Sequence, residues 1–184
     1  MQMMARMRYK ANLNATLLHA DGSSEDLGNM ELRKSWFRRL WEAIHFDERG
    51  LITDAALNAV AAELALGAQT LNTFKFHDSG TGVTAASQAD TALQTQAGPA
   101  TRATASSQTQ TQSASGTGST TPAIVTSVGT IAYVSILAIT EWGLFSQAAQ
   151  GGTMWDHRVF SAINVVSGDS IQFTYTLSIP GGGT

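Results

Sequence analysis

The chain has 184 residues, which is enough for one domain of ordinary size and an additional segment. Only 14% of the residues are charged, against roughly 25% in typical soluble domains, and the net charge is -3. This balance provides no positive field for nucleic acid or an anionic membrane, and the absence of cysteine excludes disulfides and Cys-ligated metal sites.

Neither end of the chain carries a segment that indicates a membrane. No stretch approaches the roughly 20 apolar residues that a membrane-spanning helix needs. Arg6, Arg8 and Lys10 lie near the N-terminus, but no continuous apolar run follows them, so no signal peptide is predicted. We therefore expect the protein to be made and folded in the cytoplasm.

The N-terminal part is predicted to hold an irregular arm and then a helix. Residues 1–30 form the arm, with a turn at 21–24. The next segment, Glu31 to Phe46, carries large apolar side chains at the spacing of one helical face. These residues are Leu32, Trp36, Phe37, Leu40, Trp41 and Ile44. We expect this amphipathic helix to lie on the sheet of its own chain or to reach a neighbouring subunit.

A second helix is predicted from Asp54 to about Leu66. Thr53 or Asp54 suits its N-cap, and Gly67 suits the position just after its end. Its many small residues favour close packing. On this basis the chain divides into an N-terminal arm and helical anchor segment at 1–69 and a β-sandwich domain at 70–184.

The middle of the chain is predicted to change to β-structure. A short strand is expected from Leu71 to Phe76, followed by a turn at 78–80. Residues 81–122 are mostly Ala, Thr, Ser, Gln and Gly, and for 102–118 two interpretations stay open. The segment is either a flexible linker or an exposed strand whose partner lies on another chain. Strands resume at 124–128 and 129–139, the second with apolar residues on both faces.

The last strand has the clearest pattern of all. Apolar and polar residues alternate from Ser170 to Ile179, which is the period of an antiparallel strand with one face in a core. Gly168 and Asp169 form the turn before it. With six or seven strands in residues 70–184, we predict a mainly β fold. It is an antiparallel β-sandwich of jelly-roll or Ig-like type, with an N-terminal arm and two helices.

No catalytic, cofactor-binding or metal site is predicted. His77–Asp78 and Asp156–His157 are neighbours in sequence, but adjacent residues of a strand point to opposite faces. Ser79 completes the residue types of a hydrolytic triad, yet three consecutive residues cannot adopt its geometry. Glu141 lies among large apolar residues. It is either an acid with a raised pKa or, as we favour, a carboxylate that accepts backbone amide hydrogens of a turn, with Gly143 in an unusual backbone conformation.

Several aromatic residues are candidates for contacts with partners. Tyr133, Trp142, Phe145 and Trp155 could stack on a sugar, although core or interface roles are commoner for such side chains. The predicted partner interface combines aromatic and apolar residues of the first helix with two tryptophans of the β-domain. Its members are Trp36, Phe37, Leu40, Trp41, Trp142 and Trp155.

One segment resembles a known family of proteins. The residues that carry the resemblance are Ile139, Thr140, Glu141, Gly143, Leu144, Phe145, Gly151, Gly152, Trp155, Arg158, Val159, Phe160, Gly168 and Asp169. This pattern of ITE-x-GLF, a Gly-rich turn, Arg-Val-Phe and a GDS turn resembles structural proteins of tailed-bacteriophage particles. The resemblance spans roughly 50–179. It implies a non-enzymatic component of the virion and supplies no catalytic residues.

The resemblance leads to a specific expectation. The chain is expected to be a capsid decoration or cement protein that binds the outer shell as a homo-oligomer, with a trimer favoured. Its partners would be other copies of itself and the major capsid protein or other virion proteins, without membrane or nucleic acid. The alternatives are a tail or neck component, such as an adaptor or fibre-attachment protein, and a module that recognises receptor glycans through Trp142 or Trp155.

Overall fold

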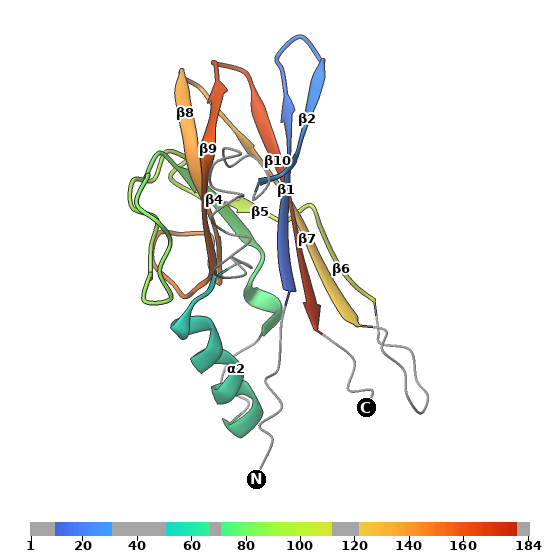
Figure 1. The fold of residues 1–184 in the computed structure, drawn as a ribbon, viewed down its shortest axis with the longest axis vertical. Coiled ribbons are helices and arrows are strands. Elements are labelled where there is room, and N and C mark those ends of the chain that lie inside the picture. Colours follow the sequence, from blue (N-terminus) through green and yellow to red (C-terminus); the bar gives the residue numbers. More distant parts are fainter. Residues whose placement is uncertain (1–9, 31–50, 67–70, 112–121, 180–184) are drawn as a thin grey trace, which may run out of the picture.

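The computed structural model describes residues 10–30, 51–66, 71–111 and 122–179, and these form a mainly β structure with two antiparallel sheets (Figure 1). Sheet A has the strand order β2-β1-β10-β7-β6, and sheet B has the order β3-β9-β8-β4-β5. The strands of sheet A are β1 (Lys10–Leu18), β2 (Ser24–Asn29), β6 (Ser107–Thr111), β7 (Ala123–Ala132) and β10 (Ser170–Ile179). Those of sheet B are β3 (Leu51–Ile52), β4 (Phe76–Gly80), β5 (Ala103–Thr104), β8 (Leu137–Phe145) and β9 (Met154–Val165).

The predicted last strand is confirmed and lies at the centre of sheet A. β10 pairs with β1 on one side and with β7 on the other. Its alternate residues point into the core, where Ile171, Phe173 and Tyr175 are at most 2% exposed. The period of two in the sequence therefore reports which face of the strand is buried.

The irregular arm predicted for residues 1–30 is wrong for residues 10–29. Those residues form β1 and β2, and β1 pairs with β10 along its full length. Ala11, Leu13, Ala15 and Leu17 alternate with polar residues and are all buried. The β-structure is consequently not confined to residues 70–184. The first predicted helix, Glu31–Phe46, lies outside the described residues.

The second helix is confirmed as α2 (Asp54–Leu66). The Thr53 hydroxyl accepts a hydrogen bond from the Ala56 amide at 3.1 Å and donates to the Met154 carbonyl of β9. Thr53 therefore caps the helix N-terminus and fixes it to sheet B. Gly67 lies outside the described residues.

The strand and turn predicted at 71–80 are displaced in the structure. Residues Leu71–Thr73 form a 3-10 helix, η2, and the strand β4 includes the three residues expected to turn. Asp78 and Ser79 are tolerated in this buried strand because other segments satisfy them. Arg102 donates to the Asp78 carboxylate, and the Ser79 hydroxyl pairs with the Tyr133 hydroxyl.

The polar segment after β4 contains a strand, as one of the two interpretations proposed. Every residue of β6 is exposed, but its partner is β7 of the same chain and not a second chain. Residues 112–118 lie outside the described residues. The strand predicted at 129–139 is wrong as a single element, because the chain crosses there from sheet A to sheet B. Val134 and Ile136, in the crossing, are 88% and 80% exposed.

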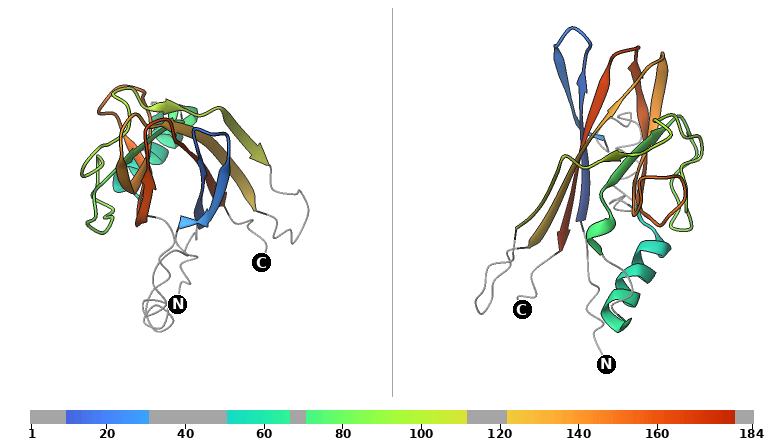
Figure 2. Two further views of the ribbon diagram at one scale, coloured as in Figure 1. Left: turned by 90° about the horizontal axis from the view of Figure 1, so that it is seen from above. Right: turned by 180° about the vertical axis from the view of Figure 1, so that it is seen from behind.

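The core lies between the two sheets, which face each other in both views of Figure 2. Trp142 of sheet B stacks on Tyr175 of sheet A, with ring centroids 5.5 Å apart, and also approaches Phe173. The opposite face of sheet B is covered by residues 81–102, which we call the 81–102 loop (Figure 2). Because both faces of β8 are covered, Ile139 to Phe145 are all buried.

Candidate functional site

The predicted interface residues fall into three groups. Trp36, Phe37, Leu40 and Trp41 lie outside the described residues. Trp142 is 0% exposed, so its predicted role in contacts with a partner or a glycan is wrong. Its ring instead stacks on Tyr175 of sheet A in the core between the two sheets. Trp155 is half-buried and stays accessible at the wall of a cavity.

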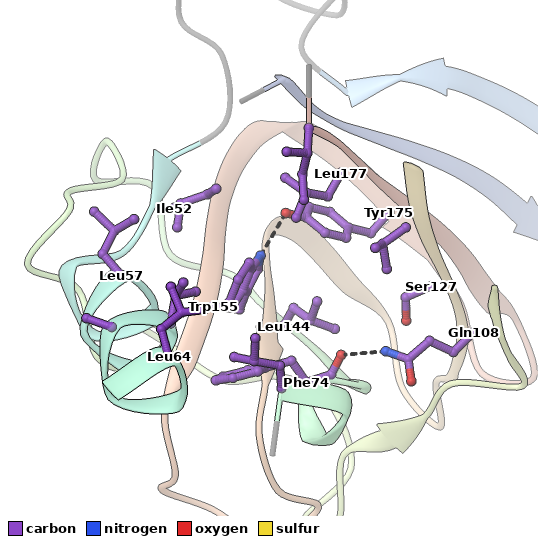
Figure 3. A pocket seen from close by; sticks show the side chains of 15 residues that line it. Ile52, Leu57, Leu64, Phe74, Gln108, Ser127, Leu144, Trp155, Tyr175 and Leu177 are labelled. Atoms are coloured by element: carbon purple, nitrogen blue, oxygen red, sulfur yellow. Dashed lines mark hydrogen bonds between the residues drawn. The ribbon is translucent and has the colours of Figure 1, made fainter. Parts of the chain in front are cut away.

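This cavity has a volume of about 490 Å³ and opens between α2 and the ends of both sheets (Figure 3). Its wall is formed by fifteen described residues, of which all but two are apolar. They are Ile52, Leu57, Val60, Ala61, Leu64, Leu71, Phe74, Gln108, Val125, Ser127, Leu144, Trp155, Tyr175, Leu177 and Ile179. The volume lies within the range typical of small-molecule sites.

The innermost lining residues on the sheets are buried, whereas two leucines that line the cavity from the helix are exposed. On the sheets, Tyr175 is 2% exposed and Leu144 is also 2% exposed. On α2, Leu57 is 37% and Leu64 is 84% exposed. The helix is fixed to sheet B at its N-terminus by Thr53, and the cavity lies between its later turns and residues of both sheets.

The polar atoms of Trp155 and Tyr175 are satisfied within the protein. The Trp155 indole nitrogen donates to the Tyr175 hydroxyl at 3.0 Å, and that hydroxyl pairs with the Asp156 carboxylate. Burial raises the pKa of Tyr175 well above its usual value, so the phenol stays neutral. Phe74 packs against the Trp155 ring at 5.0 Å. These side chains therefore present their apolar surfaces to the cavity.

Ser127 is the end of a buried chain of hydrogen bonds. The Trp142 indole nitrogen donates to His77 Nδ1 at 3.2 Å, so the ring proton of a neutral His77 must lie on Nε2. His77 Nε2 is 2.9 Å from the Ser127 hydroxyl oxygen, to which it therefore donates. Burial lowers the pKa of His77 to about 3, which keeps the ring neutral.

This arrangement does not suit nucleophilic catalysis. A general base must accept the proton of the serine hydroxyl, but His77 Nε2 already carries a proton and donates it to Ser127. Asp78 points away from His77 and binds Arg102, and Ser79 binds Tyr133. The residues 77–79 thus make three separate sets of contacts.

A second buried polar group holds the 81–102 loop on sheet B. His157 Nδ1 lies 2.6 Å from Asp90 of the loop, and its Nε2 lies 3.0 Å from Glu141 of β8. Glu141 also accepts hydrogen bonds from the amides of Gly82, Gln94 and Thr95 at 2.8–3.0 Å. We call Glu141, His157 and Asp90 the loop anchor.

The loop anchor favours the ionised forms of Glu141 and His157. Burial raises the pKa of Glu141, but the hydrogen bonds from His157 and the backbone amides outweigh it and leave the pKa lowered. Burial likewise opposes protonation of His157, but Glu141 and Asp90 outweigh it and raise the pKa. The expected carboxylate that binds backbone amides is therefore confirmed, and the alternative of a raised pKa is wrong.

Two arginines bind the buried acids Asp78 and Asp156. Arg102 binds the Asp78 carboxylate and three backbone carbonyls of the segment between β8 and β9. Its guanidinium lies 3.5 Å over the Phe145 ring. Arg158 binds Asp156 with two hydrogen bonds and reaches the Ala11 carbonyl of sheet A. Burial raises the pKa of Asp78 and of Asp156 despite these partners. Both clusters link separate parts of the fold.

No family model, curated protein or solved structure matches this chain. In the part of the chain that the structure describes, no group of three His, Asp or Glu residues is placed to hold a metal ion. The described helices include none long and apolar enough to cross a membrane.

The cavity and the loop anchor were both missed by sequence reasoning. Glu141 was singled out from its apolar surroundings, but Asp90 lies 67 residues from its partner His157, and no spacing rule joins them. The glycines of the Gly80-Thr81-Gly82 stretch were the sequence signal for a close approach of this backbone to another group, since a Cβ at Gly82 would lie 2.6 Å from the Glu141 carboxylate.

Gly143 has no positive φ, so the unusual conformation expected there is wrong. A Cβ at Gly143 would instead meet the Phe145 ring at 2.8 Å.

Proposed function

We propose that this chain is a non-enzymatic structural protein of a bacteriophage particle. In this proposal it is a decoration protein that binds the outer capsid shell as a homo-oligomer, with a trimer as the expected state. We further propose that the two sheets are a β-sandwich of jelly-roll or Ig-like type. The protein would be made in the host cytoplasm and would function on the virion.

The observation that carries this proposal is the role of the residues that give the resemblance. Glu141 binds the 81–102 loop, and Arg158 joins the two sheets. Asp169 accepts hydrogen bonds from the amides of Ala20 and Val166, and Gly168 before it has a φ of +94°. Residues that hold a fold together are those that proteins of one architecture would share without sharing a reaction. This supports an assembly role.

The buried polar groups support the same conclusion. In the described residues, the acids Asp78, Asp156 and Glu141 each bind an arginine, a histidine or backbone amides. Such groups stabilise a fold when every member is satisfied. His77 carries its proton on the nitrogen that faces Ser127, which argues against this Ser–His pair of the described residues as a nucleophile and base.

The deciding experiment is to locate and count this chain in purified particles. Quantitative mass spectrometry gives the copy number relative to the major capsid protein, and cryo-electron microscopy gives the position. Hundreds of copies distributed over the shell are expected. A dozen copies at one vertex or on the tail would replace the proposal with that of a tail or neck component, and absence from particles would refute both.

A second experiment tests the predicted anchor segment. The double variant Trp36→Ala/Trp41→Ala should bind purified capsids more weakly, because burial of each aromatic side chain contributes roughly 1.5–3 kcal/mol before ordering costs. The matched control is Val134→Ala, which removes an apolar side chain that is 88% exposed between β7 and β8. Equal loss of binding in both variants would contradict a specific anchor.

A further inference from the structure

The buried Ser127 hydroxyl has a proton with no acceptor among the described residues. Its oxygen accepts the hydrogen bond from His77, whose own proton position is set by Trp142. Ser127 is 1% exposed, so its hydroxyl is shielded from the outer surface, and an acceptor can reach it only from the cavity that it lines. Buried donors without a partner are rare in folded proteins and call for an explanation.

Ser127 lies in the wall of the cavity beside α2 (Figure 3). The neighbouring polar side chain, Gln108, donates its amide to the Phe74 carbonyl at 3.2 Å. The remaining lining is apolar, with the rings of Phe74, Trp155 and Tyr175 prominent among the labelled residues. None of the fifteen described lining residues is charged.

We propose that this cavity binds a small, neutral and mostly apolar molecule that carries one hydrogen-bond acceptor, such as a ketone or ester oxygen. The apolar body of the ligand lies between α2 and the sheets, and its acceptor receives the Ser127 proton. A carboxylate is disfavoured because no cationic side chain lines the cavity to offset its desolvation. This site is independent of the proposed role on the virion.

The sequence explains why the donor is aimed into the cavity. A Cβ at Gly129, two residues after Ser127 on β7, would lie 2.5 Å from the His77 ring. The glycine thus makes room for His77 to reach across from sheet B and occupy the acceptor side of the Ser127 hydroxyl. The hydroxyl proton is then left for the cavity.

The test uses prodan, a neutral naphthalene dye with one ketone, and the full-length chain. Saturable binding with one dye per chain is expected, with a blue shift of its emission in the apolar site. Dimethylaminonaphthalene, which lacks the ketone, serves as the comparison ligand. Loss of one neutral hydrogen bond corresponds to about 1 kcal/mol, so Ser127→Ala should weaken prodan about 5-fold and leave the comparison ligand unchanged.

A second pair of variants keeps the test decisive if Ser127→Ala fails to fold. Ala61→Trp places a large side chain in the cavity from the exposed face of α2 and should weaken both ligands at least 10-fold. Ala65→Trp makes the same change on the same helix at an exposed position outside the cavity, and should have no effect.

Three results would overturn the proposal. The first is that the full chain does not bind prodan saturably, as expected if a segment of the chain itself covers the cavity. The second is binding that strengthens when the protein is diluted, which would assign the cavity to a second copy of the chain. The third is equal binding by the Ala61→Trp and Ala65→Trp variants.

Discussion

Replacing Glu141 by glutamine is the most informative single test of how the 81–102 loop is held. One carboxylate oxygen accepts the amides of Gly82 and Thr95, and the other accepts the Gln94 amide and lies 3.0 Å from His157. Glutamine has the same shape but keeps only one acceptor oxygen. If its NH₂ group takes the place of the oxygen near His157, it faces two hydrogen-bond donors, the Gln94 amide and His157 Nε2.

The cost follows from the contacts that are lost. Two hydrogen bonds to a charged acceptor contribute about 1.5–3 kcal/mol each, and the variant leaves the Gln94 amide and His157 without an acceptor. Removing one partner of a buried ion pair costs about 3–5 kcal/mol. We therefore expect Glu141→Gln to lower the free energy of unfolding by about 3–5 kcal/mol.

Urea denaturation measures this loss, and amide hydrogen exchange locates it. Protection should fall first at Gly82, Gln94 and Thr95, because their amides bind Glu141 directly. Glu25→Gln is the matched control, since Glu25 lies exposed on β2 of the other sheet. A loss below about 1 kcal/mol, or unchanged protection of the loop amides, would refute the role given to Glu141.

The loop anchor also predicts how stability depends on pH. The pKa of His157 is raised in the fold, so its contribution is complete below the unfolded value of 6.5 and is lost as pH rises through the folded pKa. The pKa of Glu141 is lowered, so its contribution is present above 4.5 and is lost as pH falls through the folded pKa. The difference in stability between wild type and Glu141→Gln should therefore be largest between pH 4.5 and 6.5. A difference that is constant with pH would contradict this.

Three further predictions test other parts of the structure. His157→Gln should remove the loss of stability above pH 6.5, measured by urea denaturation at several pH values. Gly129→Ala should cost about 1–3 kcal/mol, because its Cβ would lie 2.5 Å from the His77 ring, and thermal unfolding that matches wild type would contradict this. Arg102→Lys should cost about 3 kcal/mol in urea denaturation, because an ammonium cannot keep both the fork of hydrogen bonds and the stack on Phe145. A cost near zero would show that charge alone suffices at that position.

The buried polar clusters explain how a chain with few charged residues keeps a specific fold. Arg158 links sheet B to the β1 carbonyl of Ala11, and His77 links it to Ser127 of β7. Each of these contacts crosses the core between the sheets. A hydrophobic core alone tolerates shifts between its layers, whereas a buried polar contact left unsatisfied is costly. The relative position of the two sheets is therefore well determined.

Local patterns in the sequence were sufficient for α2 and β10. The Thr53 cap and the small residues after it predicted Asp54–Leu66, and strict alternation predicted Ser170–Ile179. The same alternation is present at Ala11, Leu13, Ala15 and Leu17, within the residues for which an irregular arm was predicted. Both successes depend on interactions within one element, which a sequence displays directly.

The tertiary structure decided everything that depends on distant segments. Trp142 became a core residue because sheet A packs over the face of β8 from which its side chain projects, where its ring stacks on Tyr175. Asp90 and His157 meet across 67 residues, and the cavity is formed by residues from eight elements and their ends, from Ile52 to Ile179. Periodicity states which face of a strand is apolar, but the burial of that face and the partner of each polar group depend on how the chain folds back on itself.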